Sequence, residues 1–195
     1  MLARLHTSQM DFPGLEPDPV AVEFHALAAR AEPTLQALPS GPELVHRFRV
    51  SMHRVRERAG FNRQQTPAPI HGALSWDCIY YGADGEFYLY RFESCRRSDP
   101  RLDLGGFAAD LLCFALAMYD DASYRLCSSA LVSKYNSEAA YPVGEDDLQP
   151  YIVLALCQRL QRAELRTKAG TAQLLAALDA VLGDTDTAAA RGASS

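Results

Sequence analysis

Two short stretches joined by a turn decide how this sequence folds: His71–Cys78 reads HGALSWDC, and Leu89–Glu93 reads LYRFE. Cys78–Tyr81 has the composition of a short strand, and Glu86–Phe92 alternates and is rich in aromatic residues. Gly82–Gly85 lies between them and supplies glycines for the positive φ angles of a tight turn. The pattern predicts an antiparallel hairpin of two short strands.

A third stretch, Ser98–Leu104, follows the hairpin and reads SDPRLDL. In this order, the three stretches resemble the aminoglycoside phosphotransferase and choline kinase family. In that family the first stretch reads His-Gly-Asp, four residues and Asn; the second reads hydrophobic-Asp-Phe-Glu; the third contains Asp-Pro-x-x-Asp-Leu. The resemblance covers about residues 42–140. It implies an α+β, mostly helical fold, the C-terminal lobe of a kinase-like protein with a helical bundle and one short β-hairpin.

The resemblance also assigns positions to the groups that carry phosphoryl transfer. Ala73 stands where the family has its catalytic Asp, while Cys78 and Arg91 stand where it has the Asn and Asp that bind magnesium. The framework of the motif remains. In this family His71 and the Asp at the place of Asp103 brace the catalytic loop by hydrogen bonds, and the structural motif also includes Gly72 and, as a turn residue before proline, Asp99.

The three replacements remove the chemistry that phosphoryl transfer needs, which is positioning and charge neutralisation. Ala73 has no proton acceptor. Cys78 offers a soft thiol, whereas magnesium takes hard oxygen ligands. Arg91 places a fixed positive charge where the cation would sit, which opposes metal binding. Alternatively, the guanidinium of Arg91 contacts a phosphate directly.

Two carboxylates near the lost positions are candidate substitutes: Asp77 as the base and Glu93 as a metal ligand. Side chains alternate along a strand, so residues 91 and 93 are expected on the same face, with Glu93 pointing toward the former metal site. The other interpretation of Glu93 is a solvated side chain or an ion pair with Arg91 or Arg96.

The rest of the chain reads as helices. Residues 1–41 are expected to form an extended lead-in and a first helix that Pro33 kinks or ends early, residues 42–183 the kinase-like C-lobe domain, and residues 184–195 a disordered tail. Asn62–Pro69 is expected to be a polar loop. The helices are predicted over residues 19–37, 42–59, 106–119, 122–136, 147–166 and 171–182.

The family also carries an N-terminal lobe, a mostly β nucleotide-gripping sheet with a lysine on one strand. Residues 1–70 are too few and too helical for it, contain no glycine-rich phosphate loop, and precede the first lysine, Lys134. We therefore expect the N-lobe to be absent. The open alternatives are that another chain supplies it in trans, or that the sequence is a fragment of a longer protein.

Composition restricts the partners and the compartment. The 195 residues are 48% hydrophobic and 22% charged, with a net charge of −5, which is typical of a globular protein and predicts no nucleic-acid partner. The five cysteines are widely spaced and show no zinc-site pattern. No secretory signal or 18-residue apolar run is visible, so we expect a cytoplasmic protein without a membrane segment.

Two functional hypotheses follow. In the first, the chain is a catalytically deficient phosphotransferase-like pseudoenzyme that binds a small ligand or a protein partner and needs no cofactor. In the alternative, it is an active ATP-dependent small-molecule kinase with a rebuilt site, in which Asp77 is the base, Glu93 binds magnesium, and the N-lobe comes in trans. Apolar surface on the hairpin side also allows a homodimer.

Overall fold

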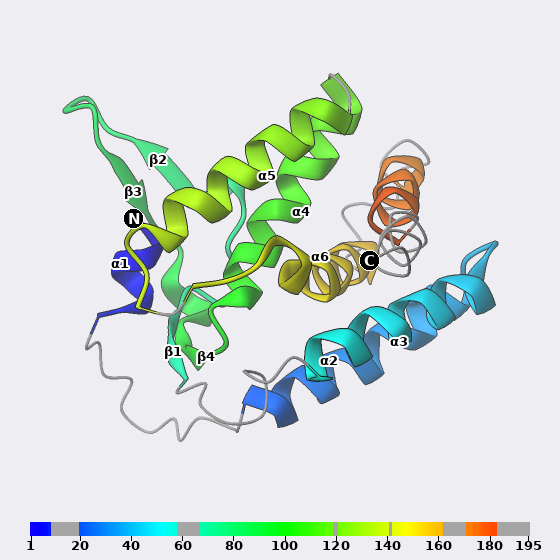
Figure 1. The fold of residues 1–195 in the computed structure, drawn as a ribbon. Helices are drawn as coiled ribbons and strands as arrows, with labels where there is room; N and C mark the ends of the chain where they lie inside the picture. The colour runs from blue at the N-terminus through cyan, green and yellow to red at the C-terminus, as the bar shows by residue number, and fades with distance from the viewer. Residues whose placement is uncertain (9–19, 58–66, 119–120, 141, 162–170, 183–195) are drawn as a thin grey trace, which may run out of the picture.

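Helices make up most of the fold, and two small antiparallel sheets complete it (Figure 1). The computed structural model describes residues 1–8, 20–57, 67–118, 121–140, 142–161 and 171–182. The helices are α1 (Leu2–His6), α2 (Val20–Gln36), α3 (Gly41–Glu57), α4 (Arg101–Met118), α5 (Asp121–Asn136), α6 (Glu145–Gln161) and a last helix over 171–182. The strands are β1 (Ala68–Ile70), β2 (Ile79–Tyr81), β3 (Phe87–Leu89) and β4 (Arg96–Ser98). The predicted α+β, mostly helical class is confirmed.

The two central helices are α4 and α6, which pack directly against each other. Both carry apolar residues on most of their circumference, and Leu104, Leu112, Val153 and Leu156 are completely buried. Close approach depends on Gly105, because a Cβ there would overlap the Tyr151 side chain and lie 2.8 Å from its carbonyl carbon. The helix pair forms the base on which the loop after β1 rests.

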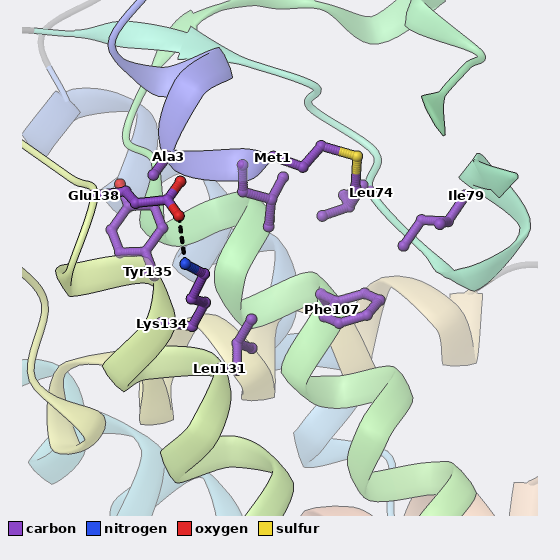
Figure 2. A pocket seen from close by; sticks show the side chains of 10 residues that line it. Met1, Ala3, Leu74, Ile79, Phe107, Leu131, Lys134, Tyr135 and Glu138 are labelled. Atoms are coloured by element: carbon purple, nitrogen blue, oxygen red, sulfur yellow. Dashed lines mark ion pairs between the residues drawn. The ribbon is translucent and has the colours of Figure 1, made fainter. Parts of the chain in front are cut away.

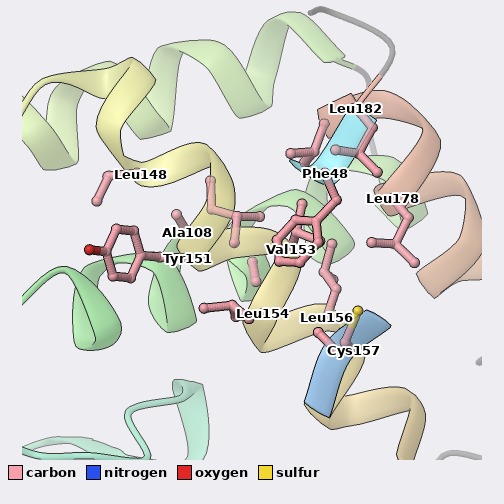
Figure 3. Packing of buried hydrophobic residues seen from close by; sticks show 14 of the residues in the cluster. Phe48, Ala108, Leu148, Tyr151, Val153, Leu154, Leu156, Cys157, Leu178 and Leu182 are labelled. Atoms are coloured by element: carbon pink, nitrogen blue, oxygen red, sulfur yellow. The ribbon is translucent and has the colours of Figure 1, made fainter. Parts of the chain in front are cut away.

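The remaining helices enclose this pair. Figure 3 shows Phe48 of α3 and Leu178 and Leu182 of the last helix gathered around Val153 of α6. Phe24 and three further apolar residues of α2 belong to the same core cluster, so the core continues across the boundary expected after residue 41. Of the two alternatives for Pro33, an early end of the helix is wrong, since α2 continues to Gln36, one residue short of the predicted end at 37.

The predicted hairpin is present and projects away from the helices (Figure 1). Strands β2 and β3 pair antiparallel, with Tyr80 opposite Tyr88, and Gly85 takes a φ of +83° in the turn. The expected second strand is shorter than predicted, because it ends at Leu89. Residues Phe92–Ser94 instead form a short 3₁₀ helix, η2, and a second one, η1 (Trp76–Cys78), precedes β2.

A second sheet was not predicted. Strand β1 pairs with β4 antiparallel, which places Ile70 opposite Arg96. Part of the segment expected to be a polar loop, Ala68–Pro69, is thus a strand. Three residues are too few to show an alternating pattern, so the sequence alone gave no signal for either strand. The pairing brings the chain entering the His71 loop beside the chain leaving η2.

The N-terminal segment also differs from the expected extended lead-in. Residues Leu2–His6 form a short helix, and Ala3, Leu5 and His6 are buried. Helix α4 begins at Arg101, five residues before the predicted start. The predicted helix ends at 59, 119 and 166 and the predicted tail over 184–195 fall outside the described residues.

Candidate functional site

The loop that follows β1 is held by the buried carboxylate of Asp103 in the first turn of α4. The backbone N–H groups of His71 and Gly72 donate to its two oxygens, at 2.6 and 2.9 Å. The Nε2–H of His71 donates to the carbonyl oxygen of Tyr90 at 2.8 Å, which ties the loop to the end of the hairpin. His71 and Asp103 are 0% and 1% exposed. The bracing hydrogen bonds expected of these two residues are therefore present.

A histidine far away in sequence completes this arrangement. The Nε2 of His6 lies 3.2 Å from Oδ2 of Asp103, and its Nδ1 lies 3.0 Å from the Tyr135 hydroxyl. Burial raises the pKa of Tyr135 to about 12, and the nearby carboxylates of Asp99 and Asp103 add to the effect. Sequence reasoning missed His6, because no local pattern links it to a partner 97 residues away.

Asp99 forms a second buried cluster beside the first. It accepts hydrogen bonds from the backbone N–H and from Nε and Nη2 of Arg101, the last at 2.7 Å. The Tyr151 hydroxyl of α6 donates to Asp99 Oδ2 at 2.6 Å. Burial and this carboxylate raise the pKa of Tyr151 well above its usual range. Asp99 was expected to be a turn residue; it also links the start of α4 to α6.

Gly72 allows the loop to lie close to the chain after η2. Its φ is +82°, and a Cβ there would overlap the Ser94 carbonyl oxygen and the Arg96 guanidinium. A side chain at this position would therefore strain the backbone and displace the loop. The second residue of the motif is a glycine for a local steric reason.

Two of the positions that the resemblance selected for chemistry, Ala73 and Cys78, lie along this loop, and the third, Arg91, lies between β3 and η2. Ala73 is exposed, and Cys78 is buried, with its Sγ 3.6 Å from the Ala73 carbonyl oxygen and 3.4 Å from the Ser75 hydroxyl. Arg91 is exposed and has a φ of 67°, the one positive φ among the described non-glycine residues. Asp and Asn tolerate this left-handed conformation better than most side chains, and strain of this kind often lies at functional sites.

Arg91 and Asp77 form an ion pair at the end of the loop. Arg91 Nη1 donates to Asp77 Oδ2 at 2.8 Å, with the two side chains 54% and 68% exposed. The other oxygen of Asp77 accepts a hydrogen bond from Ser75. The Ser75 hydrogen bond, and after it Arg91, holds the pKa of Asp77 below its ordinary value. The candidate base is thus a stabilised carboxylate engaged by two partners, which weakens it as a proton acceptor.

The segment between the loop and the hairpin is anchored on α4. The Trp76 backbone N–H donates to Asp110 at 3.0 Å, and the Trp76 ring lies 4.7 Å from that of Phe107. Asp110 is also paired with Arg159 of α6 at 2.7 Å. These contacts fix the position of Asp77 relative to the helices.

Glu93 does not take the position that strand alternation predicts. It lies in η2, after a left-handed residue, so residues 91 and 93 do not share the face of a strand. Its side chain is exposed and makes no hydrogen bond or ion pair with the described residues. The exposed side chain agrees with the other interpretation, a solvated Glu93, whereas the pairing with Arg91 is not found, since Arg91 pairs with Asp77. Within the described part of the chain, no three His, Cys, Asp or Glu side chains form a group that could hold a metal ion.

An apolar pocket of about 240 Å³ opens beside the loop (Figure 2). Leu74 of the loop, Ile79 of β2, Phe107 of α4 and Leu131 of α5 line it together with the start of α1. An ion pair between Lys134 and Glu138 lies at its edge. Its walls come from distant parts of the sequence, and no local pattern indicates the pocket.

The projecting hairpin exposes aromatic side chains. Those of Tyr80, Tyr81 and Phe87 are each about 60% exposed, and the rings of Tyr81 and Phe87 lie 4.9 Å apart. Tyr81 and Phe87 are opposite each other in the register, so their rings form a cross-strand pair. The pairs still leave a large apolar surface open to solvent.

Comparisons of the chain with protein-family models, with curated proteins and with solved structures gave no match. Among the described helices, none combines the length and the apolar character needed to cross a bilayer.

Proposed function

We propose that this chain is a phosphotransferase-like protein of the aminoglycoside phosphotransferase type that lacks catalytic activity and acts as a ligand- or partner-binding pseudoenzyme. The observation that carries the proposal is the ion pair between Arg91 and Asp77. It places a guanidinium at the family's metal-binding position and engages the one carboxylate of the loop that could replace the base.

The kinase-like scaffold is supported by the buried hydrogen bonds around Asp103. They join the His-Gly segment to the start of α4 and, through His71, to the end of the hairpin. These are the positions that the family resemblance selects for bracing the loop. A framework with this degree of burial can persist when the residues that carry the chemistry are replaced, because its stability does not depend on them.

The surroundings of each candidate catalytic or metal-binding residue support the proposed loss of catalysis. Ala73 offers no proton acceptor, and the Cys78 thiol is buried against the loop backbone. Asp77 is engaged by Ser75 and Arg91. Glu93 is exposed on η2, outside the strand geometry that would aim it at a metal. Magnesium needs several oxygen ligands in near-octahedral order, which these groups are poorly arranged to provide.

The proposal also covers the compartment and the binding partners of the protein. The five thiols are free in the structure, which fits the reducing cytoplasm that we propose as its compartment. The partner is a small ligand or a protein, with the exposed hairpin as a surface for a second copy or another chain. No nucleic-acid partner is proposed.

The test is nucleotide binding by calorimetry on the purified full chain, with ATP and ADP, each with and without magnesium. We expect no magnesium-dependent binding. A gain-of-function variant sharpens the test: Arg91→Asp removes the guanidinium and places a second carboxylate beside Asp77, so weak Mn²⁺ binding should appear. Arg91→Ala is the matched control, because it removes the charge without adding a ligand. Magnesium-dependent nucleotide binding by the unmodified chain would overturn the proposal in favour of a rebuilt kinase site.

A further inference from the structure

A small polar cavity lies between the loop and α6. Its volume is about 60 Å³, and its walls are the loop residues Gly72–Ser75, Leu27 of α2, Gly106 of α4, and Tyr151 and Arg159 of α6. One water molecule needs roughly 10–15 Å³ of such volume. The cavity can therefore hold several waters or one group the size of a carboxylate or phosphate.

The charged side chains that line the cavity are all positive. Among the described residues that line it, Arg96 and Arg159 are charged and no aspartate or glutamate takes part. Four carboxylates contact lining residues, and each is already engaged. Asp110 is paired with Arg159, and Asp103 accepts the N–H groups of His71 and Gly72. Asp99 accepts from the Tyr151 hydroxyl, and Asp77 accepts from the Ser75 hydroxyl. Gln158, an exposed neutral amide, completes the rim.

Both guanidinium groups are held in place before any ligand arrives. Arg96 Nη1 donates to the Ser94 carbonyl oxygen at 3.2 Å and lies against Gly72. Arg159 Nη2 donates to the Gly106 carbonyl oxygen at 2.9 Å and pairs with Asp110 at 2.7 Å. Fixed donors lose little freedom when they bind an anion, which favours binding.

The loop adds further donors. The backbone N–H groups of Ala73, Leu74 and Ser75 make no hydrogen bond with the described residues, although all three residues line the cavity. The Arg159 Nη1 atom is likewise buried without a partner in the described part of the chain. Unused backbone N–H groups beside guanidinium groups are a recurrent way of binding oxyanions.

We propose that this cavity binds the oxyanion of a small ligand, a phosphate or carboxylate group, between Arg96 and Arg159. The inference rests on the proposed function, because it names the ligand class for the same loop. The anion would bind without magnesium, since guanidinium and backbone N–H donors, and not a metal ion, would contact it. The ligand of the pseudoenzyme is then an acidic small molecule whose anionic group enters beside Gly72.

The experiment uses titration calorimetry on the full chain in chloride buffer of constant ionic strength without metal. Inorganic phosphate and acetate are titrated separately, so that the two arms distinguish a phosphate from a carboxylate preference. We expect saturable binding of at least one of them. Arg96→Gln should weaken it about tenfold, the change expected for loss of one charge-assisted contact.

Two substitutions of Gln158, at the rim of the cavity, distinguish an effect on binding from a folding defect. Gln158→Glu should weaken the binding several-fold and Gln158→Lys should strengthen it, while both leave the thermal unfolding midpoint nearly unchanged, because this side chain is exposed. Arg49→Gln, which breaks an exposed ion pair with Glu32 on α2 and α3, is the matched control and should bind like the unmodified chain.

Two results would overturn the inference: no saturable binding of phosphate or acetate, or binding that Arg96→Gln and Gln158→Glu leave unchanged. Neither result bears on catalysis. The proposed function fails separately, through magnesium-dependent nucleotide binding, so the two failures are distinguishable.

Discussion

The loop after β1 has an inner end at His71 and Gly72 and an outer end at Asp77, and the two ends differ in their burial and in the contacts that hold them. At the inner end, Asp103 is 1% exposed and accepts hydrogen bonds from His71, Gly72 and His6. At the outer end, Asp77 and Arg91 form an ion pair with both side chains more than half exposed. Buried, hydrogen-bonded carboxylates are costly to remove, whereas exposed ion pairs contribute little. The residues at the exposed end of such a loop can therefore change while the buried hydrogen bonds that hold the loop are kept.

The largest effect is expected at the inner end. Asp103→Ala leaves the buried N–H of His71 and the half-buried N–H of Gly72 without an acceptor. We expect the free energy of unfolding to fall by about 3–5 kcal/mol, measured by urea denaturation. Asp77→Ala is the matched control at the outer end and should cost less than about 1 kcal/mol. Equal losses for the two variants would remove the distinction between the two ends.

The packing beneath the loop can be tested with adjacent glycines of α4. Gly105→Ala brings a Cβ onto Tyr151 of α6 and should destabilise the protein by about 1–3 kcal/mol. Gly106→Ala places its Cβ 3.1 Å from the Leu74 carbonyl oxygen, where only the loop has to adjust, and should cost less. Thermal unfolding of both variants gives the order. If Gly106→Ala were the more destabilising variant, the loop, and not the contact between α4 and α6, would be the part that cannot adjust.

A smaller effect is expected for the second buried carboxylate. Tyr151→Phe removes the hydroxyl that donates to Asp99 and keeps the ring. Asp99 retains its bidentate contact with Arg101, so the loss should be about 0.5–1.5 kcal/mol in urea denaturation. A loss as large as that of Asp103→Ala would mean that the two clusters act as one unit.

The smallest effect is expected for the exposed pair itself. A double-mutant cycle of Asp77→Asn and Arg91→Gln should give a coupling energy of about 0.2–1 kcal/mol at neutral pH. The pKa of Asp77 is lowered in the folded protein, so its contribution is present above the pKa of the unfolded chain and is lost as the pH falls through the folded value. The coupling should therefore vanish in acid. Coupling that persists there would show that the charge of Asp77 is not its source.

The sequence predicted those parts of the fold that repeat a pattern over many residues. The hairpin and the long helices were identified because their periodicity and turn residues extend over enough positions. Strands β1 and β4 have three residues each, and α1 has five, so their structure follows from tertiary contacts. His6 is the clearest example, since its burial depends on Asp103 and Tyr135.

For the candidate site, the sequence predicted which residues support the loop better than it predicted where the exposed side chains lie. The family resemblance implied that His71 and Asp103 each brace the loop by hydrogen bonds, and both residues make hydrogen bonds to the loop or to the chain beside it. The shared strand face expected for residues 91 and 93 is wrong, because β3 ends at Leu89 and Glu93 lies in η2 after the left-handed residue Arg91, while the solvated alternative agrees with its exposed side chain. The cavity between Arg96 and Arg159 joins residues 63 positions apart, and no local pattern indicates it.

The most direct test of the central claim is an ATP-turnover assay with magnesium on the purified full chain, using Asp77→Ala as the comparison. We predict no turnover above the buffer rate for either protein, because the proposed function puts Ala73 at the base position and the charge of Arg91 at a metal position. Magnesium-dependent turnover that Asp77→Ala abolishes would contradict the account and identify a rebuilt catalytic site.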